Sequence, residues 1–406
     1  MRRFLIVALL LGLLAACGGQ SSGGPTVAPG ATMAPGPTSA QPGASAPTAP
    51  EAATSTTAPG GQPTAAPEPT APPAPTAPSA AGQRTLVVMA HDSFSVSEDV
   101  LKAFEQREGA TVQVLKSGDA GQALNKAILS KSSPLADVLY GVDNTFLSRA
   151  LASGIFEPYA APALKDIPDR FKLDPSNSLL PVDYGYVSIN YDKAYLAKNN
   201  LAPPAKLEDL TKPEWKSRLV VENPATSSPG LAFMLATIGR FGTSGGYTWL
   251  DYWKDLRKND VLVSSDWSDA YYTQFSGSSG QGPRPLVVSY ASSPPAEVFF
   301  SDGKLTEPPT GVIDDGSFLQ VEFAGILKGA RQPELAARFL DFMLGKQFQE
   351  DMPLQMFVYP VAQGAALPEL FTKFAPVPAQ PLAVPPDQID QNREQWIDEW
   401  TRAVLR

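Results

Sequence analysis

The sequence of 406 residues carries 32 Lys and Arg against 41 Asp and Glu, with one His and one Cys. A single Cys excludes an intrachain disulfide and a Cys-rich zinc site, and a single His excludes most His-based metal and catalytic sites. The net charge of −9 disfavours nucleic acid as the main partner, because binding to phosphate backbones needs a cationic face.

The N-terminal residues have the pattern of an export signal. Two arginines precede an apolar run from Phe4 to Leu14, which is too short to span a bilayer of about 30 Å as a helix. The run ends in Leu14-Ala15-Ala16-Cys17-Gly18, which resembles a bacterial lipobox. We therefore predict a lipoprotein signal peptide over residues 1–16 and lipidation of Cys17. The protein is then extracytoplasmic and lipid-anchored to the cell membrane, either in a periplasm or on the outer face of a cell. A free Cys beside a simple signal peptide is the alternative.

A low-complexity stretch follows the predicted lipidation site. From Gly18 to Gln83 the chain is mostly Ala, Pro, Thr, Ser and Gly, and it contains no aromatic residue. Such a composition cannot bury enough apolar surface to offset the entropy lost on folding. We predict that residues 17–83 form a disordered, partly polyproline-II tether that holds a globular part away from the membrane.

The globular part, residues 84–406, opens with a strand-and-helix rhythm. Hydrophobic periodicity predicts strands at 85–89, 111–115 and 136–140, alternating with helices near 96–104, 122–131 and 144–152. This order predicts a parallel sheet with helices on its faces, and ligands of such sheets bind beyond the carboxyl ends of the strands. The polar candidates in the corresponding loops are Asp92, Ser93, Asp119, Gly121, Asp143 and Asn144.

A second α/β region begins after an alternating strand at 182–191. The segment Ser227-Ser228-Pro229-Gly230 has the chemistry of a helix start, with hydroxyl caps followed by Pro in the first turn. The free N–H groups of such a helix terminus can hold an anion or a polar ligand atom. The alternative is that these hydroxyls only cap their own helix.

Aromatic residues gather where loops are predicted. Trp267, Tyr290, Phe357 and Tyr359 lie at or beside such loops, and aromatic faces at the mouth of a cleft suit a flat cationic ligand. Packing in a core is the alternative for each of them. For Trp396 and Trp400, four residues apart on the last predicted helix, we predict core packing.

The run His91-Asp92-Ser93 suggests a serine hydrolase at first sight. Consecutive residues at a strand end point in different directions, whereas a working triad converges from separated positions. No G-x-S-x-G elbow is present either. We therefore predict binding without catalysis.

Ordered blocks of sequence run through the whole globular part. They begin with Asp92-Ser93-Phe94 and continue at 136–144, 183–186, 226–231, 267–271, 289–290, 319–322, 359–361 and 395–400. In this order the blocks resemble the thiamine-binding periplasmic proteins of ABC importers.

The resemblance implies a fold and a function. The fold is an α/β periplasmic binding protein of type II, a two-lobed Venus flytrap with parallel-rich sheets. Lobe 1 would comprise 84–187 and 316–406, lobe 2 would comprise 188–315, and the hinge would lie near 186–190 and 311–323. Such a protein captures thiamine or its phosphates between the lobes and delivers it to an ABC transporter permease. We expect a monomer that is not an enzyme and that carries no cofactor and no metal.

The resemblance also implies positions for the ligand. It places Asp92, Asp119, Ser227, Trp267 and Tyr290 at or near it. With the loop and aromatic residues above, the predicted ligand-binding set is Asp92, Ser93, Asp119, Gly121, Asp143, Asn144, Tyr184, Ser227, Ser228, Gly230, Trp267, Tyr290, Phe357 and Tyr359. Two positions depart from the family pattern: Ala296 replaces an aromatic residue and Phe357 replaces a Trp. These departures predict a different stacking arrangement and leave the preferred form of thiamine open.

Two related ligands are alternatives within the same fold. Ferric ion could be held by Tyr271 and Tyr272 together with His91, since these are hard ligands. A polyamine is the other, because acidic and aromatic clefts also bind linear cations. Two alternatives belong to other functional classes. The protein could be an enzyme for ester or glycoside substrates, or a surface spacer that binds no small ligand.

Overall fold

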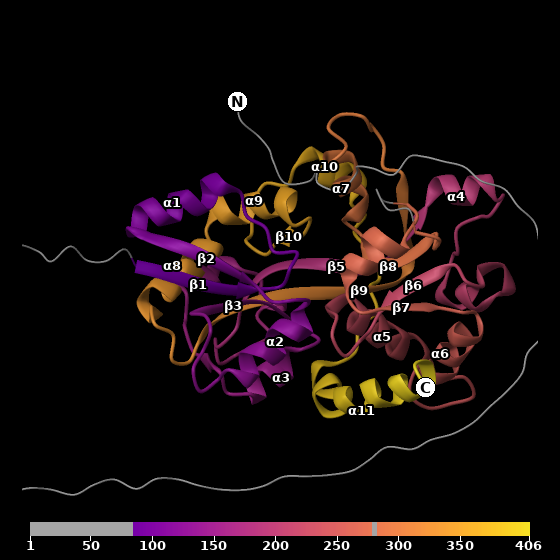
Figure 1. The fold of residues 1–406 in the computed structure, drawn as a ribbon, viewed down its shortest axis with the longest axis horizontal. Helices are drawn as coiled ribbons and strands as arrows, with labels where there is room; N and C mark the ends of the chain where they lie inside the picture. Colours follow the sequence, from indigo (N-terminus) through magenta and orange to yellow (C-terminus); the bar gives the residue numbers. More distant parts are fainter. Residues whose placement is uncertain (1–83, 278–281) are drawn as a thin grey trace, which may run out of the picture. The chain divides into compact units, whose positions relative to one another are not determined.

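The computed structural model describes residues 84–277 and 282–406 (Figure 1). The predicted signal peptide, Cys17 and the predicted tether lie outside the described residues. Within the described part of the chain, no helix is both long enough and apolar enough to cross a membrane.

The strands of the described residues join in one sheet with the order β2-β1-β3-β9-β5-β8-β6-β7, while β4 pairs with β9 and β10 pairs with β5. Their bounds are β1 Arg84–Ala90, β2 Ala110–Lys116, β3 Val138–Asp143, β4 Phe156–Glu157, β5 Leu180–Asp192, β6 Leu219–Glu222, β7 Leu262–Ser264, β8 Leu286–Tyr290, β9 Thr310–Leu327 and β10 Tyr359–Pro360.

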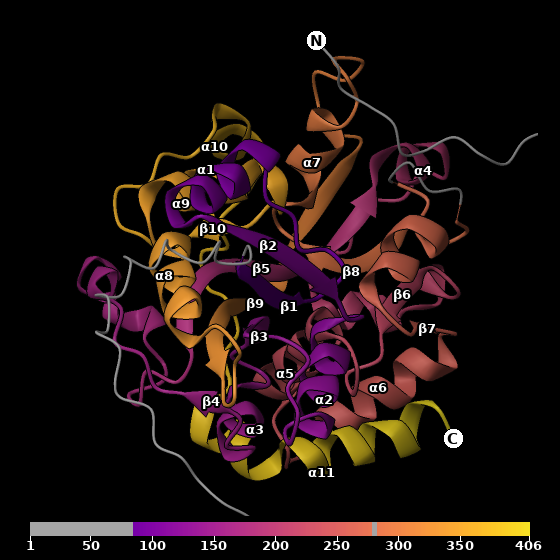
Figure 2. The same ribbon diagram turned by 60° about the vertical axis from the view of Figure 1, so that its left-hand side comes forward.

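Helices cover the sheet on both faces (Figure 2). They are α1 Glu98–Glu108, α2 Ala120–Leu129, α3 Leu147–Ala152, α4 Lys193–Lys198, α5 Ser228–Phe241, α6 Trp249–Lys258, α7 Ser293–Phe299, α8 Pro333–Met343, α9 Lys346–Gln355, α10 Glu369–Phe374 and α11 Pro386–Val404. Short 3-10 turns occur at Pro162–Asp166, Asp169–Phe171, Leu207–Thr211 and Pro213–Trp215, and a π-helical segment, η5, spans Asp269–Gln274.

The first strands and helices form as predicted. Strand β1 pairs in parallel with both β2 and β3, and helices α1, α2 and α3 follow the three strands in turn. Helix α1 buries Val100 and Phe104, one turn apart, and ends at Gly109, whose φ of 60° is a left-handed conformation that glycine adopts without strain. The hydrophobic periodicity of this region was therefore sufficient to predict its local structure.

Two long central strands connect the two ends of the sheet (Figure 1). Strands β5 and β9 are antiparallel to each other, and β9 also pairs antiparallel with β3 while β5 pairs antiparallel with β8. The outer strands on each side are parallel, β2-β1-β3 on one and β8-β6-β7 on the other. The described residues therefore form a mixed α/β fold with parallel pairing in both outer parts of the sheet.

The register of β5 against β9 is irregular where the hinge was predicted. It shifts between Val187 and Ile189, opposite Phe318 and Ile313. A bulge of this kind leaves residues out of the ladder and bends the strand. The lobe boundaries at 187/188 and 315/316 stay a prediction, because the position of a bulge does not define a rigid body.

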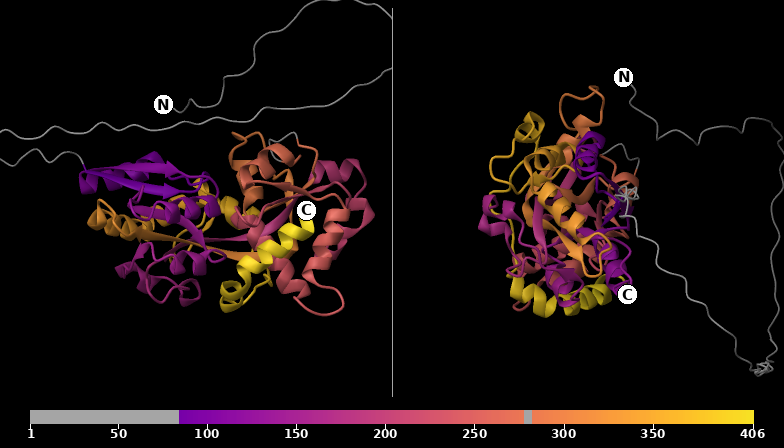
Figure 3. Two further views of the ribbon diagram at one scale, coloured as in Figure 1. Left: turned by 60° about the horizontal axis from the view of Figure 1, so that its bottom comes forward. Right: turned by 90° about the vertical axis from the view of Figure 1, so that its left-hand side faces the viewer.

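Helices α5 and α11 pack beside the sheet, α5 directly on its strands and α11 on other helices. Helix α5 is buried from Ser228 to Ile238 and packs on β9 and β8, so its first turn is held at the edge of the central strands. Helix α11 packs on α3 at one end of the sheet and on α6 at the other (Figure 3). Its Trp396 and Trp400 are buried, which confirms their predicted place in the core.

Candidate ligand-binding site

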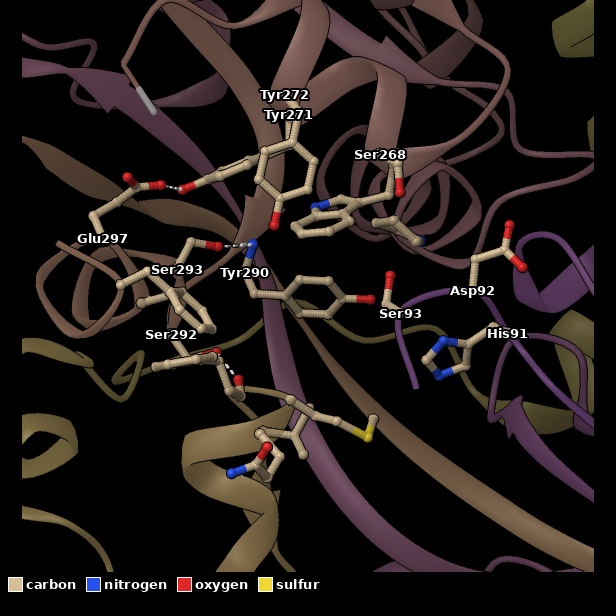
Figure 4. Close-up of a pocket in the computed structure, with 18 of the residues that line it drawn as sticks. His91, Asp92, Ser93, Ser268, Tyr271, Tyr272, Tyr290, Ser292, Ser293 and Glu297 are labelled. Carbon is tan, nitrogen blue, oxygen red and sulfur yellow. Dashed lines mark hydrogen bonds between the residues drawn. The ribbon is translucent and has the colours of Figure 1, made fainter. Parts of the chain in front are cut away.

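A cavity of about 890 Å³ lies where the two parts of the sheet meet. One side consists of the loop after β1, and the opposite side consists of η5 and the start of α7, with Tyr290 between them (Figure 4). A cavity of this size falls in the range of sites for small organic ligands.

The charged groups of the cavity wall are almost all acidic. Asp92, Asp119, Glu297 and Glu322 line it, and His91 is the one basic side chain among the described lining residues, which include no Lys and no Arg. Carboxylates grouped on low-dielectric walls create a negative potential that attracts cations. The cavity therefore favours a positively charged ligand.

Aromatic rings form the wall opposite His91. Trp267 stacks on Tyr271 with ring centroids 5.1 Å apart and an interplanar angle of 18°. Tyr272 meets the same indole edge-on at 5.4 Å, and Tyr290 lies 6.5 Å from it. This cluster presents π-faces and edges to the cavity, and a cation over such a face gains about 0.5 to 2 kcal/mol.

Hydrogen bonds fix these rings in place. The indole Nε1 of Trp267 donates to Oγ of Ser289 at 2.9 Å, and Ser289 in turn bonds to the hydroxyl of Ser293 at 2.9 Å. The Tyr271 hydroxyl donates to Glu297 at 2.8 Å (Figure 4). Burial raises the pKa of Glu297, and its hydrogen bond from Tyr271 opposes that rise.

The ring of Tyr290 lies against strand β5. A Cβ added to Gly185 would lie 3.3 Å from Cδ1 of Tyr290, so the glycine lets the ring rest close to the backbone. The Tyr290 hydroxyl donates to Oε1 of Gln320 on β9 at 3.3 Å. One aromatic side chain of the cavity thus contacts both central strands.

A buried polar network extends from the cavity wall and joins the three strands β3, β5 and β9. His91 Nε2 lies 3.4 Å from a carboxylate oxygen of Glu322 on β9. The hydroxyl of Tyr140 on β3 lies 3.0 Å from Glu322 and 2.6 Å from Asp183 on β5. Because these groups exclude water and share few donors, their protonation states depend on one another.

The network shifts the pKa values of Asp183 and Glu322 in opposite directions. Burial, and then the charge of Glu322, raises the pKa of Asp183 well above its usual range. Burial alone would raise the pKa of Glu322. The charge of His91 and the hydrogen bonds with His91, Asp183 and Tyr140 outweigh burial, so the pKa of Glu322 is lowered. For His91, burial acts to lower the pKa, and the attraction of Glu322 prevails and raises it. The consistent state is an imidazolium and glutamate pair beside a neutral Asp183.

Asp119 joins the cavity through a helix cap. It is the N-cap of α2, its carboxylate accepts from the N–H of Ala120 at 2.8 Å, and its own N–H donates to Gln122. Burial raises the pKa of Asp119, and the neighbouring hydroxyl of Ser227 partly opposes the rise. Behind it, burial and then the charge of Asp119 raise the pKa of Glu222 well above its usual range.

Behind the cavity wall, the start of α5 and the loop before it directly contact β3 and α2. The hydroxyl of Ser228, in the first turn of α5, donates to the carboxylate of Asp143 at the end of β3. A Cβ on Gly121, in α2, would lie 2.7 Å from the carbonyl oxygen of Thr226. Glycine at position 121 therefore allows α2 and the loop before α5 to approach to backbone contact.

The structure divides the sequence-predicted residues into two groups. Those that line the cavity are Asp92, Ser93, Asp119, Ser228, Trp267, Tyr290 and Phe357. Those that do not line it are Gly121, Asp143, Asn144, Tyr184, Ser227, Gly230 and Tyr359. Which of them contact a ligand stays a prediction.

Residues of the second group support the wall. Asp143 is fully buried and accepts from the N–H and hydroxyl of Thr145, both at 2.6 Å. Asn144 connects β3 to β9 through the carbonyl of Leu319 and the N–H of Val321.

Tyr184 and Tyr359 stack on each other with ring centroids 5.2 Å apart, away from the cavity. A Cβ on Gly230 would lie 2.5 Å from the carbonyl of Glu222, so this glycine allows α5 to contact β6.

The predicted helix start at Ser227 and Ser228 is confirmed, but the alternative that their hydroxyls only cap this helix is wrong. Ser227 occupies the N-cap of α5, but its hydroxyl makes no capping bond to the helix. The hydroxyl of Ser228 is directed to Asp143, which lies behind the cavity wall at the end of β3. Both hydroxyls face acidic groups and not the backbone of their own helix.

Sequence reasoning missed several lining residues. Glu322 and Glu297 were not predicted, and Ser292 and Ser293 were not noticed. Glu322 is a charged residue inside an otherwise apolar strand, which is a recognisable signal of a paired or functional carboxylate. The Ser-Ser-Pro-Pro sequence at 292–295 repeats the hydroxyl-then-Pro helix start at 227–229 and begins α7.

The hydrolase and ferric-ion alternatives find little support in the contacts. His91 faces Glu322, while Asp92 accepts from the N–H of Gly118 at 2.9 Å, so His91, Asp92 and Ser93 form no relay. Tyr271 donates to Glu297 on the opposite side of the cavity from His91 (Figure 4). In residues 84–277 and 282–406 no group of three or more His, Cys, Asp or Glu side chains is arranged to hold a metal.

Known proteins resemble the chain along most of its globular part. The family model described as bacterial extracellular solute-binding protein matches residues 133–392. The thiamine-binding periplasmic protein of Salmonella typhimurium is 34% identical over 333 residues, which cover 80% of this chain and 95% of that protein. The thiamine-binding periplasmic protein of Brucella suis is 32% identical and covers 81% of this chain and 94% of its own.

Solved structures agree with these relatives. A periplasmic thiamin binding protein superposes with a TM-score of 0.70 at 30% identity and covers 80% of this chain and 97% of its own. The ferric binding protein from Campylobacter jejuni, at 17% identity and a TM-score of 0.61, covers 78% of this chain and 99% of its own and shares the fold alone. The chain therefore belongs to the bacterial extracellular solute-binding proteins, in the family that includes the thiamine-binding periplasmic proteins.

Proposed function

We propose that this protein captures thiamine or a thiamine phosphate in the cavity and delivers it to the permease of an ABC importer. The observation that supports this best is the composition of the wall, in which four carboxyl groups and a cluster of aromatic rings occur without any Lys or Arg among the described lining residues. Thiamine is a flat cation with two rings, so its charge and its shape both match this wall.

The residues have separable tasks in this proposal. Trp267, held by its bond to Ser289, offers a fixed face for stacking on one ring of the ligand. Asp92 lies on the facing side and Asp119 lies beside the backbone of Trp267. A carboxylate at either place can meet the thiazolium charge or accept hydrogen bonds from the aminopyrimidine. The 14-residue helix α5 begins at the wall with Ser228 and provides a place for a phosphate tail.

Capture in this proposal requires closure and no chemical step. The lobes rotate about β5 and β9 near the register shift at Val187 and Ile189, and the ligand leaves water as they close. No bond of the ligand is made or broken, and no cofactor takes part. Cys17 carries the lipid that holds the monomeric protein at the extracytoplasmic face of the membrane, close to its permease.

Calorimetric titration tests the ligand assignment. The purified protein is titrated separately with thiamine, its monophosphate and its diphosphate, and we expect at least one of the three to bind with micromolar or tighter affinity. No heat and no thermal shift with any of the three at millimolar concentration would refute the assignment. The ranking of the three identifies the transported form.

Two competing cations are tested in the same preparation. Spermidine shares the positive charge of thiamine but has no ring, so we expect it to displace thiamine poorly. Ferric ion is expected to produce no visible tyrosinate charge-transfer band. Strong displacement by spermidine would assign the site to polyamines, and a coloured ferric complex would assign it to iron.

The membrane anchor has its own test. Expression of Cys17→Ala beside the unsubstituted chain, followed by separation of membranes, should move the protein from the membrane fraction to the soluble one. Retention of the variant at the membrane would refute lipidation of Cys17 as the anchor.

A further inference from the structure

Phe300, which directly follows α7, is exposed although it lines the cavity. Its side chain is 64% exposed, a large fraction for a phenylalanine. Its N–H donates to the carbonyl of Ala296 at 2.9 Å, so the helical geometry of α7 extends to position 300. Helical side chains lie over the turn that precedes them. The ring of Phe300 therefore lies toward the space that the small side chain of Ala296, also on the cavity wall, leaves open.

A rigid aromatic group supports Phe300 from behind. The ring of Phe300 lies 5.4 Å from that of Phe357, which stacks on Phe371 at 5.9 Å with an interplanar angle of 15°. Phe357 has a φ of 56°, a left-handed conformation that is unusual for a side chain of this size. The hydroxyl of Ser292 donates to the carbonyl oxygen of Phe357 and helps to hold it there.

The surroundings indicate what the exposed ring is for. Trp267, Tyr271, Tyr272 and Tyr290 form one aromatic cluster on β8, on η5 and just before η5. Phe300 and Phe357 belong to a separate cluster on the segments after α7 and α9. Phe300 contacts two rings, Phe299 at 5.2 Å and Phe357 at 5.4 Å between centroids, and it keeps a large apolar surface open to water. A flat apolar group placed against that surface would remove it from water, which is favourable in proportion to the area.

We propose that Phe300 is a specificity-determining residue that covers the second ring of a two-ring cation, while the Trp267 cluster stacks on the first. This inference rests on the proposed function, because it assumes that the ligand is thiamine or a phosphate of it. It adds the reason for selectivity: only a ligand with two flat rings uses both aromatic clusters, so a linear cation of equal charge gains nothing from Phe300.

The chain provides a matched control. Phe299 is the preceding residue, is 41% exposed and lies 5.8 Å from the ring of Phe357, but it does not line the cavity. Loss of either ring removes a contact with Phe357 and the 5.2 Å contact between the two phenylalanine rings, and only loss of Phe300 removes surface from the cavity. Comparison of Phe300→Ala with Phe299→Ala therefore separates contact with the ligand from support of the aromatic group.

The experiment measures the dissociation constants of thiamine and spermidine for the full chain, Phe300→Ala, Phe299→Ala and Phe300→Trp. Phe300→Ala should weaken thiamine binding about fivefold to tenfold, which is typical for one aromatic stacking contact. Its affinity for spermidine should change less than twofold. Phe299→Ala should bind thiamine within twofold of the parent, and Phe300→Trp should restore most of the affinity. Thermal unfolding of each variant establishes that it is folded.

The outcomes distinguish this inference from the proposed function. If the unsubstituted protein does not bind thiamine or its phosphates, the proposed function is wrong and the role of Phe300 falls with it. If the unsubstituted protein binds thiamine and Phe300→Ala binds it equally well, the proposed role of Phe300 is refuted and the proposed function stands. Equal losses in Phe299→Ala and Phe300→Ala would also overturn it, because the effect would then come from the support of Phe357.

Discussion

Gly141 lacks the side chain that would collide with His91. A Cβ on Gly141 would lie 2.4 Å from Cδ2 of the imidazole, and its φ of +97° is accessible mainly to glycine. The register of β3 against β9 shifts between Tyr140 and Val142, on either side of this residue. The irregularity of the strand therefore gives the imidazole its place beside Glu322.

The first prediction concerns this space. Gly141→Ala should lower the free energy of unfolding by about 2 to 4 kcal/mol, because it adds backbone strain and a clash with a buried ring. Gly245→Ala, at a φ of +120° with no atom within 4 Å of its added Cβ, carries the strain without the clash and should lose about 1 kcal/mol. Urea unfolding measures both variants. In a double-mutant cycle, His91→Ala should recover part of the loss in Gly141→Ala, and strict additivity would contradict the proposed clash.

The second prediction concerns stacking. Trp267→Ala should weaken thiamine binding by at least about 1 kcal/mol, roughly fivefold, because it removes the fixed face of the aromatic cluster. Trp267→Phe should lose less, since it keeps a ring and loses only the bond to Ser289. Tyr247→Ala removes an exposed ring that does not line the cavity and serves as the control. Calorimetric titration gives the three affinities, and equal affinity of Trp267→Ala and the parent would remove Trp267 from the site.

The third prediction is a pH dependence of binding. Glu322 holds the pKa of His91 above 6.5, Asp119 adds to this attraction, and burial and Lys116 oppose it. As pH rises through this pKa, the imidazolium loses its charge and the cavity becomes more negative, so affinity for a cation should increase. His91→Gln should bind thiamine more tightly than the parent at pH 6 and should show a flatter profile above pH 6.5. An unchanged profile in this variant would assign the pH dependence to other groups.

The stability of the parent should depend on pH in the opposite direction. A histidine with a raised pKa in the folded state contributes stability that is fully present below pH 6.5 and is lost as pH rises through the folded pKa. Urea unfolding between pH 6 and pH 9 should therefore show a decline that His91→Gln lacks. Measuring both quantities on one preparation separates an effect on binding from an effect on folding.

The fourth prediction concerns Asp143, which lies behind the cavity. Burial raises its pKa to about 6, although hydrogen bonds from Ser228 and Thr145 oppose the rise. The folded state therefore holds a proton that the unfolded state releases near pH 4, and stability falls as pH increases from about 4 to 6. Asp143→Asn should stabilise the protein above pH 6, by up to about 3 kcal/mol for a rise of that size. It should give little gain near pH 4.

Denaturant unfolding at pH 4.5, 6 and 8 tests this sign. Ser228→Ala provides the complementary variant, because it removes a donor to the ionised carboxylate and should destabilise the protein more at pH 8 than at pH 4.5. A gain from Asp143→Asn that does not vary with pH would show that the carboxyl group does not titrate in this range.

The sequence predicted local structure well because hydrophobic period and glycine stops depend on neighbouring residues. The strand at 85–89 and the helix that ends at Gly109 are examples. The placement of Asp92 and Ser93 at the cavity followed from a general property of parallel sheets, and so did that of Asp119.

The other residues of the cavity wall could not be predicted, because their positions depend on strand order, which is a property of the whole chain. Strand β9 is inserted between β3 and β5, and this long-range pairing brings Glu322 to within reach of His91, 231 residues earlier in the chain. Tyr359 was predicted beside a loop and Tyr184 in the strand at 182–191, yet β5 and β10 pair these two residues with each other instead of with the cavity. Local patterns carry no information about such partners.

His91 is the only histidine of the chain, and it stands in the cavity wall. The Hε1 proton of its ring is thus the only histidine Hε1 signal in a proton NMR spectrum of the protein. The chemical shift of that signal as a function of pH follows the ionisation of His91. A change in the same chemical shift when a ligand is added reports that the cavity is occupied.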